Sequence, residues 1–172
     1  MTERILVDQV EETSLLSVRQ VSRTIVFGGV CVGTLDGLAA TMNAGIKGVG
    51  PDKVFHYIAS GLIGPDLSYN GGAATVVLGL LLHFAIAFGV VAIFLLLGRS
   101  FPSLPRRAAI SGAVYGVVVY FVMSYLIVPL SAASSLPFSF SGMVTGIAIH
   151  ISAVGLPTAI IAQRSLVSHK NY

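Results

Sequence analysis

Hydrophobic residues in this chain gather into four long runs, separated by connections rich in polar residues, glycine or proline. The runs cover residues 24–46, 73–97, 108–130 and 140–162. About 20 residues of α-helix cross the ~30 Å hydrocarbon core of a bilayer, and each run exceeds that length. Because a chain within lipid must satisfy its own backbone hydrogen bonds, the runs are expected to be helices. The pattern therefore predicts an all-α, polytopic membrane protein with four transmembrane helices packed as a bundle.

The connection over residues 48–72 is the longest, and it carries a helical signal of its own. Pro51 suits the first position of a helix, and Asp52 suits its first turn. The apolar residues that follow recur at helical spacing: Val54, Phe55, Ile58 and Leu62. We expect a short amphipathic helix in this first outer loop, lying at the membrane surface.

The composition agrees with a membrane setting. Hydrophobic residues make up 55% of the 172 residues and charged residues only 10%, against about 25% charged in soluble domains. The polar segments 1–23 and 163–172 are expected to be tails on either side of the four-helix domain 24–162. The basic residues are not interleaved with aromatics, so no nucleic-acid partner is expected.

Lysine and arginine are distributed unevenly among the polar segments. Eight of them fall in the first tail, the second connection and the last tail: Arg4, Arg19, Arg23, Arg99, Arg106, Arg107, Arg164 and Lys170. Only Lys47 and Lys53 fall in the first connection, and residues 131–139 hold none. The positive-inside rule therefore predicts that both termini lie in the cytoplasm.

Small residues recur at four-residue spacing on three of the runs. The glycines that follow this GxxxG pattern are Gly29, Gly33, Gly37, Gly112, Gly116, Gly142 and Gly146. Such stripes let helix backbones approach closely within lipid. We expect a tight bundle, in which some stripes could instead face a second copy of the chain or another subunit of a larger membrane complex.

Four polar side chains, one on each run, are predicted to share one depth in the membrane. Asp36 and Tyr120 lie ten residues before the ends of their runs, and His83 and His150 lie ten residues after the starts of theirs. At 1.5 Å per residue, all four lie about 15 Å below the outer boundary. Ionisable residues within a bilayer are costly and normally face the protein interior, so we expect a midplane cluster.

Four interpretations of this cluster stand side by side. Asp36 could orient a histidine in a purely structural hydrogen-bonded clasp. The cluster could respond to protons or conduct them, because histidine titrates near neutral pH. His83 and His150 could ligate haem b between the second and fourth helices. Two histidines and a carboxylate could also hold a metal ion.

Short motifs along residues 25–162 carry a resemblance to a known family. They are Leu82 with His83, Phe101 with Pro102, Gly112, Pro129 with Leu130, and His150. In these positions the chain resembles the YagU-type family of small bacterial inner-membrane proteins. The resemblance implies four helices, a histidine in the second span at His83, and an association with acid resistance. It implies no catalytic residue.

The function expected from the sequence is that of a non-enzymatic membrane protein linked to acid or envelope stress. No phosphate-binding loop, dinucleotide fingerprint, nucleophile elbow or HExxH motif is present in the chain. Membrane lipid is the expected partner, and no cofactor is required. The alternatives are a haem-binding or accessory subunit of a larger membrane complex, or a small transporter component.

Overall fold

The computed structural model describes residues 2–135 and 137–166, with the side chains of residues 2–17 left undescribed. The described residues form helices and no strand. The elements in chain order are α1 Thr2–Ile46, α2 Pro51–Ile63, α3 Pro65–Asn70, α4 Gly72–Ser100, α5 Ser103–Arg106, α6 Ala108–Val122, the π-helix η1 Met123–Ile127, α7 Val128–Leu130, α8 Phe140–Ile149, the π-helix η2 His150–Gly155, and α9 Leu156–Leu166. The predicted last tail lies mostly outside the described residues.

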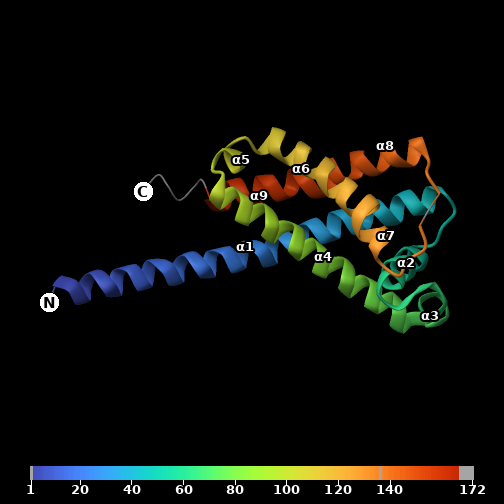
Figure 1. Ribbon diagram of the computed structural model, residues 1–172, viewed down its shortest axis with the longest axis horizontal. Helices are drawn as coiled ribbons and strands as arrows, with labels where there is room; N and C mark the ends of the chain where they lie inside the picture. The colour runs from blue at the N-terminus through green and yellow to red at the C-terminus, as the bar shows by residue number, and fades with distance from the viewer. Residues whose placement is uncertain (1, 136, 167–172) are drawn as a thin grey trace.

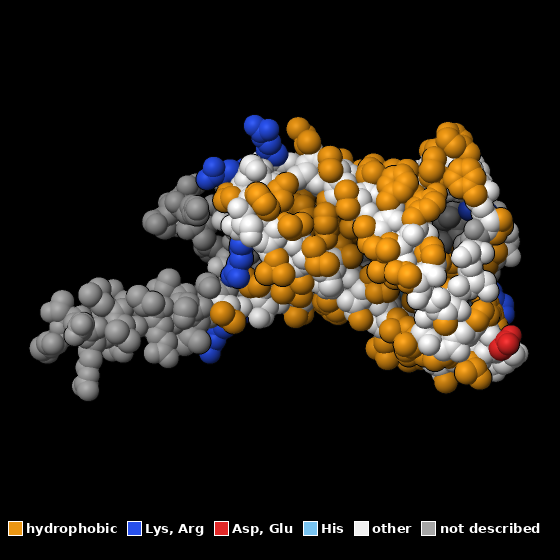
Figure 2. Space-filling view, in the orientation of Figure 1, with side chains coloured by type: hydrophobic (Ala, Val, Ile, Leu, Met, Phe, Trp, Pro, Cys, Tyr) orange, Lys and Arg blue, Asp and Glu red, His pale blue; other side chains and the backbone are white. Residues whose placement is uncertain are grey.

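Four helical segments are long and apolar enough to cross a membrane, which confirms the predicted fold class. They cover Val18–Ile46, Gly72–Ser100, Ala108–Leu130 and Phe140–Leu166. Hydrophobic side chains cover the lateral surface between them, as Figure 2 shows. This surface is what a bundle surrounded by lipid presents, because lipid does not penalise exposed apolar groups.

The first helix is longer than its hydrophobic run. α1 continues without a break from Thr2 through the predicted polar tail into the membrane span and projects beyond the bundle (Figure 1). No glycine or proline occurs between Thr2 and Phe27 to end the helix. Hydrophobicity marks where lipid is expected, whereas backbone propensity decides where a helix stops, so the two boundaries differ.

The spans pack around a core close to the end of the bundle that carries α5, which we call the α5 end. α1 packs on α4 and on the segment from η2 to α9, while α6 packs on η2 and α9. Val91, Phe94 and Leu95 of α4 are almost fully buried in this core. The opposite end, which we call the α2 end, carries α2, α3 and the 131–139 connection (Figure 1).

The predicted helix in the first connection is present and begins at Pro51. α2 packs on α4, and its buried residues are His56, Ala59 and Ser60. Leu62, which the apolar periodicity singled out, is 62% exposed. The face of α2 that is buried is thus formed by His56, Ala59 and Ser60, and not by the apolar residues that define the predicted amphipathic pattern.

Both π-helices end just before a proline. η1 ends two residues before Pro129, and η2 ends two residues before Pro157. Proline has no N–H to donate, and its ring collides with the carbonyl four residues earlier, so a widened turn relieves both problems. η2 begins at His150, so this widened turn also positions a residue of the predicted cluster.

The glycines of the small-residue stripes meet neighbouring helices at all but one position. Those of α1 face α4: Gly29 lies on Phe88, Gly33 on Phe84 and Gly37 on His83. A Cβ at Gly112 would lie 2.9 Å from the Gly155 carbonyl oxygen, and one at Gly116 would lie 2.5 Å from that of His150. These positions have no room for a side chain.

The fourth-span glycines differ from each other. A Cβ at Gly146 would lie 2.5 Å from Cε2 of Tyr120 on α6, so this glycine lies at a helix contact. A Cβ at Gly142 would meet only Ser139, the N-cap of its own helix, whose hydroxyl accepts a hydrogen bond from the Gly142 N–H. Gly142 therefore makes no contact with a neighbouring helix of this chain, and the packing role predicted for it stays a prediction.

Candidate functional site

A cavity of about 480 Å³ lies inside the bundle toward the α2 end. Residues from α1, α2, α4, α6, η1 and η2 line it, and most of them are aliphatic. Its polar lining consists of Asp36, Tyr57, His83, Ser131 and His150. A mainly apolar cavity of this size with a few polar groups is typical of a ligand or reaction site.

His83 is held in place by the backbone of α1. Its Nε2 lies 2.8 Å from the Gly33 carbonyl oxygen, and the ring lies against Gly37. A carbonyl oxygen only accepts hydrogen bonds, so Nε2 carries the proton and donates it. Nδ1 of the neutral ring is therefore a free acceptor. Glycine at both α1 positions lets the ring reach the helix backbone.

His150 is held by its own helix in the complementary way. Its Nδ1 donates to the Gly146 carbonyl oxygen at 2.9 Å, which leaves Nε2 as the free acceptor. The Tyr120 ring meets the imidazole edge to face, with 5.5 Å between the ring centres. Tyr120 is thus next to His150, but it does not line the cavity itself.

The second nitrogen of each histidine can still be reached by water. Among the described side chains, only Thr158 Oγ1 is a fully enclosed polar atom without a hydrogen-bond partner. Nδ1 of His83 and Nε2 of His150 also make no hydrogen bond to a described residue. Since they are not among the enclosed atoms, both nitrogens are accessible.

Asp36 lies on the cavity wall, partly buried, without the partner predicted for it. Between the described side chains, no hydrogen bond or ion pair joins Asp36 to His83 or to His150. The clasp expected from the sequence joins Asp36 to a histidine directly or through one water, and the direct form is not present. The ring N–H of each histidine donates instead to a backbone carbonyl oxygen, that of Gly33 for His83 and that of Gly146 for His150.

Polar contacts of α2 cover the cavity at the α2 end. The Tyr57 hydroxyl donates a hydrogen bond to the Ser134 carbonyl oxygen at 3.3 Å. The Ala132 N–H donates one to the Gly61 carbonyl oxygen at 3.0 Å. Burial, and then the nearby Tyr69, raises the pKa of Tyr57. The hydroxyl consequently keeps its proton and remains a donor at physiological pH.

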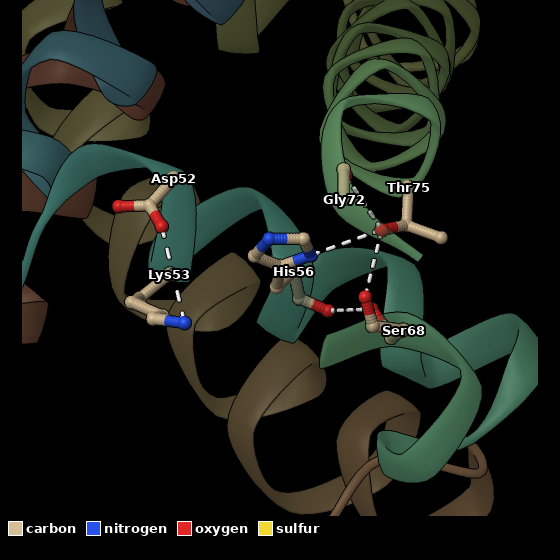
Figure 3. A network of polar contacts seen from close by, with 6 residues as sticks. All are labelled: Asp52, Lys53, His56, Ser68, Gly72 and Thr75. Atoms are coloured by element: carbon tan, nitrogen blue, oxygen red, sulfur yellow. Dashed lines mark hydrogen bonds and ion pairs between the residues drawn. The ribbon is translucent and has the colours of Figure 1, made fainter. Parts of the chain in front are cut away.

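A second polar group, beside the cavity, joins α2, α3 and α4 (Figure 3). Thr75 donates to the Ser68 carbonyl oxygen at 2.7 Å and lies 3.1 Å from Nδ1 of His56, and Ser68 donates to the His56 carbonyl oxygen. His56 is only 5% exposed, although it lies in the polar first connection, where a histidine would be expected to be solvated. It is buried because α3 and α4 fold over α2, which the sequence pattern did not indicate.

Comparison with protein-family models, with curated proteins and with solved structures finds no match to this chain. The function of the cavity must therefore be inferred from the side chains that line it.

The cavity does not suit a bis-histidine haem. Nε2 of His83 is bonded to the Gly33 carbonyl oxygen, and the ring lies against Gly37, so an iron ion could not reach this nitrogen without displacing α1. The described residues also contain no group of three His, Cys, Asp or Glu side chains placed to hold a metal ion. Asp36, His83 and His150 share a cavity but do not form a metal-ligand triad.

Proposed function

We propose that this chain is a non-enzymatic membrane protein whose interior cavity responds to protons, and that it acts in acid or envelope stress. One observation carries the proposal: His83 and His150 each keep one ring nitrogen free on the cavity that Asp36 also lines. Histidine is the side chain whose charge changes between about pH 5 and 8. The association that the YagU-type resemblance implies supports the same role.

The proposed response follows from charge in an apolar setting. Protonation of either histidine adds a positive charge to a cavity whose wall holds the Asp36 carboxylate. Opposite charges attract strongly where few polar groups screen them. The attraction favours a closer approach of α1 to α4 or to η2, so proton uptake would change the packing of three spans. The lysine and arginine distribution supports a bacterial inner membrane with cytoplasmic termini.

The test is a histidine titration by NMR on the ¹⁵N-histidine-labelled protein in nanodiscs. His83→Gln and His150→Gln identify the two resonances, and both should titrate between about pH 5 and 8. Asp36→Asn should change the titration, because it removes the carboxyl group from the cavity wall that both histidines share. Asp66→Asn is the matched control, since Asp66 is exposed on α3 outside the cavity.

The proposal fails if neither histidine titrates in that range, or if Asp36→Asn and Asp66→Asn titrate alike. The physiological part needs a separate measurement. Bacteria that depend on the parent protein for survival of an acid challenge should lose this protection with Asp36→Asn. Unchanged survival, alongside a shifted titration, would separate the proton response from acid stress.

A second candidate function is the binding or transport of an apolar cation. The volume of the cavity and the Asp36 carboxylate, which has no partner among the described side chains, favour this candidate. Tetraphenylphosphonium is a suitable probe for calorimetry with the detergent-solubilised protein. Binding should weaken as the pH falls and should be lost with Asp36→Asn, whereas equal binding by this variant would exclude the candidate.

A further inference from the structure

A second hollow lies at the α5 end, between the start of the first span and the end of the last. It is an open groove of about 700 Å³ between α1 and α9. The residues that line it are Arg19, Gln20, Arg23, Thr24, Phe27, Ile161, Arg164 and Ser165. Three of the eight are arginines, and neither the cavity nor its proposed function involves them.

Buried and half-buried polar contacts hold the two walls of the groove together. The Gln20 side-chain amide donates to the Ser165 carbonyl oxygen at 2.8 Å, and the Thr24 and Ser165 hydroxyl oxygens lie 2.7 Å apart. Thr24 is only 9% exposed. These contacts fix α9 against α1, so arginines from two helices face one space in a defined arrangement.

The groove is strongly positive. Among residues 18–135 and 137–166 the carboxylates are Asp36, Asp52 and Asp66. Asp36 lines the interior cavity, and the other two lie on α2 and α3 at the far end. An anion is therefore the ligand that the groove favours.

The floor of the groove is apolar and leads into the membrane. Phe27 is 63% exposed, and it lies four residues, or about 6 Å along the helix, deeper than Arg23. Ile161 lies one turn deeper than Ser165 on α9. A molecule with an anionic head and hydrocarbon chains would satisfy both parts of the groove, whereas a free anion would use only the charged part.

We propose that this groove binds an anionic phospholipid. Arg19, Arg23 and Arg164 hold the phosphate, because a guanidinium donates two parallel hydrogen bonds to phosphate oxygens. Phe27 and Ile161 lie along the acyl chains. Basic pockets between membrane helices are suited to phosphate headgroups in this way. The proposal is independent of the proton-responsive cavity and does not require it.

The test compares lipid binding by native mass spectrometry of the full chain in detergent. The probes are phosphatidylglycerol and phosphatidylcholine with the same acyl chains, and inorganic phosphate. The parent should bind phosphatidylglycerol in preference to phosphatidylcholine. The triple variant Arg19→Gln/Arg23→Gln/Arg164→Gln should bind phosphatidylglycerol at least about tenfold more weakly, since three charge-assisted contacts are lost.

The matched control removes the same charge at the same end of the molecule. Arg99, Arg106 and Arg107 are exposed outside the groove, so Arg99→Gln/Arg106→Gln/Arg107→Gln should bind phosphatidylglycerol like the parent. If the groove variant is unfolded by circular dichroism, Arg19→Lys/Arg23→Lys/Arg164→Lys replaces it. This variant keeps the charge but loses the paired hydrogen bonds. It should therefore bind phosphatidylglycerol more weakly than the parent does, without losing binding altogether.

Three results would overturn the proposal. Equal loss in both glutamine variants would show a general charge effect. Equal binding of the two lipids would show an apolar groove without headgroup recognition. Competition by inorganic phosphate as effective as that by phosphatidylglycerol would identify a free-phosphate site and exclude a lipid site.

Discussion

Glycine and histidine shape the interior of this protein at the scale of single residues. His83 reaches the Gly33 carbonyl oxygen because neither Gly33 nor Gly37 has a side chain in the way. Gly116 allows the carbonyl of His150 to approach α6 in the same manner. The absence of a side chain thus positions both titratable rings of the cavity.

Gly116→Leu should lower the thermal stability of the protein in detergent. A Cβ there would lie 2.5 Å from a backbone oxygen, which cannot rotate away, so α6 and η2 must separate. Overpacking of this kind costs about 1–3 kcal/mol or more. Gly89→Leu is the control, since nothing lies within 4 Å of its Cβ position. Equal melting temperatures for the two variants would show that Gly116 does not lie at a close helix contact.

Gly33→Leu should have a smaller effect than Gly116→Leu. The Cβ at Gly33 would meet the Phe84 side chain, 2.6 Å away, and a side chain can adopt another rotamer more easily than a backbone can move. The same melting experiment ranks the two variants. A larger loss at Gly33 would indicate that the α1–α4 contact, and with it His83, limits stability.

At the scale of elements, buried polar contacts decide how the short helices attach to the spans. α2 and α3 are too short to be stable by propensity alone, so their stability must come from packing. The network of His56, Ser68 and Thr75 supplies hydrogen bonds from three elements at once (Figure 3). The cover of the cavity therefore depends on polar contacts beside it.

Thr75→Val should loosen this cover while leaving the four spans intact. The substitution keeps the shape but removes the hydroxyl, which leaves a buried histidine nitrogen and the Ser68 carbonyl oxygen without this partner, at about 1–3 kcal/mol. Hydrogen exchange should rise in residues 51–70. Thr41→Val is the control, because the Thr41 hydroxyl bonds only within its own helix. Unchanged exchange in residues 51–70 would contradict a stabilising role for the network.

At the scale of the whole molecule, charge separates the two ends. Lysine and arginine side chains gather at the α5 end (Figure 2). The α2 end holds Asp52 and Lys53, whose side chains form an ion pair of 3.9 Å (Figure 3). The positive-inside rule predicts from this difference that the α5 end faces the cytoplasm. The same prediction puts the α2 end, which covers the cavity, on the periplasmic side.

Reporter fusions test that orientation. A reporter after Tyr172 should be active in the cytoplasm, and one inserted within residues 131–139 should be active in the periplasm, because eight of ten lysines and arginines lie on the first side. A glycosylation or phosphatase reporter pair gives the readout. The reverse pattern would overturn both the orientation and the periplasmic placement of the cavity cover.

The sequence by itself determined the four spans and the helix from Pro51. Both features follow from local properties of the chain. The length of an apolar run indicates a membrane span, and a proline suits the first position of a helix. The helix that contains the first span begins at Thr2, well before the predicted span start at residue 24, because hydrophobicity does not report where a helix ends.

Only the tertiary structure decided which atoms meet. It turned His83 toward the Gly33 carbonyl oxygen and left Asp36 without a histidine partner, and it buried His56. Residue spacing gives a position along a helix axis, but hydrogen-bond partners depend on the rotation and separation of neighbouring helices. Those quantities follow from side-chain packing across the whole bundle, which no single segment of the chain contains.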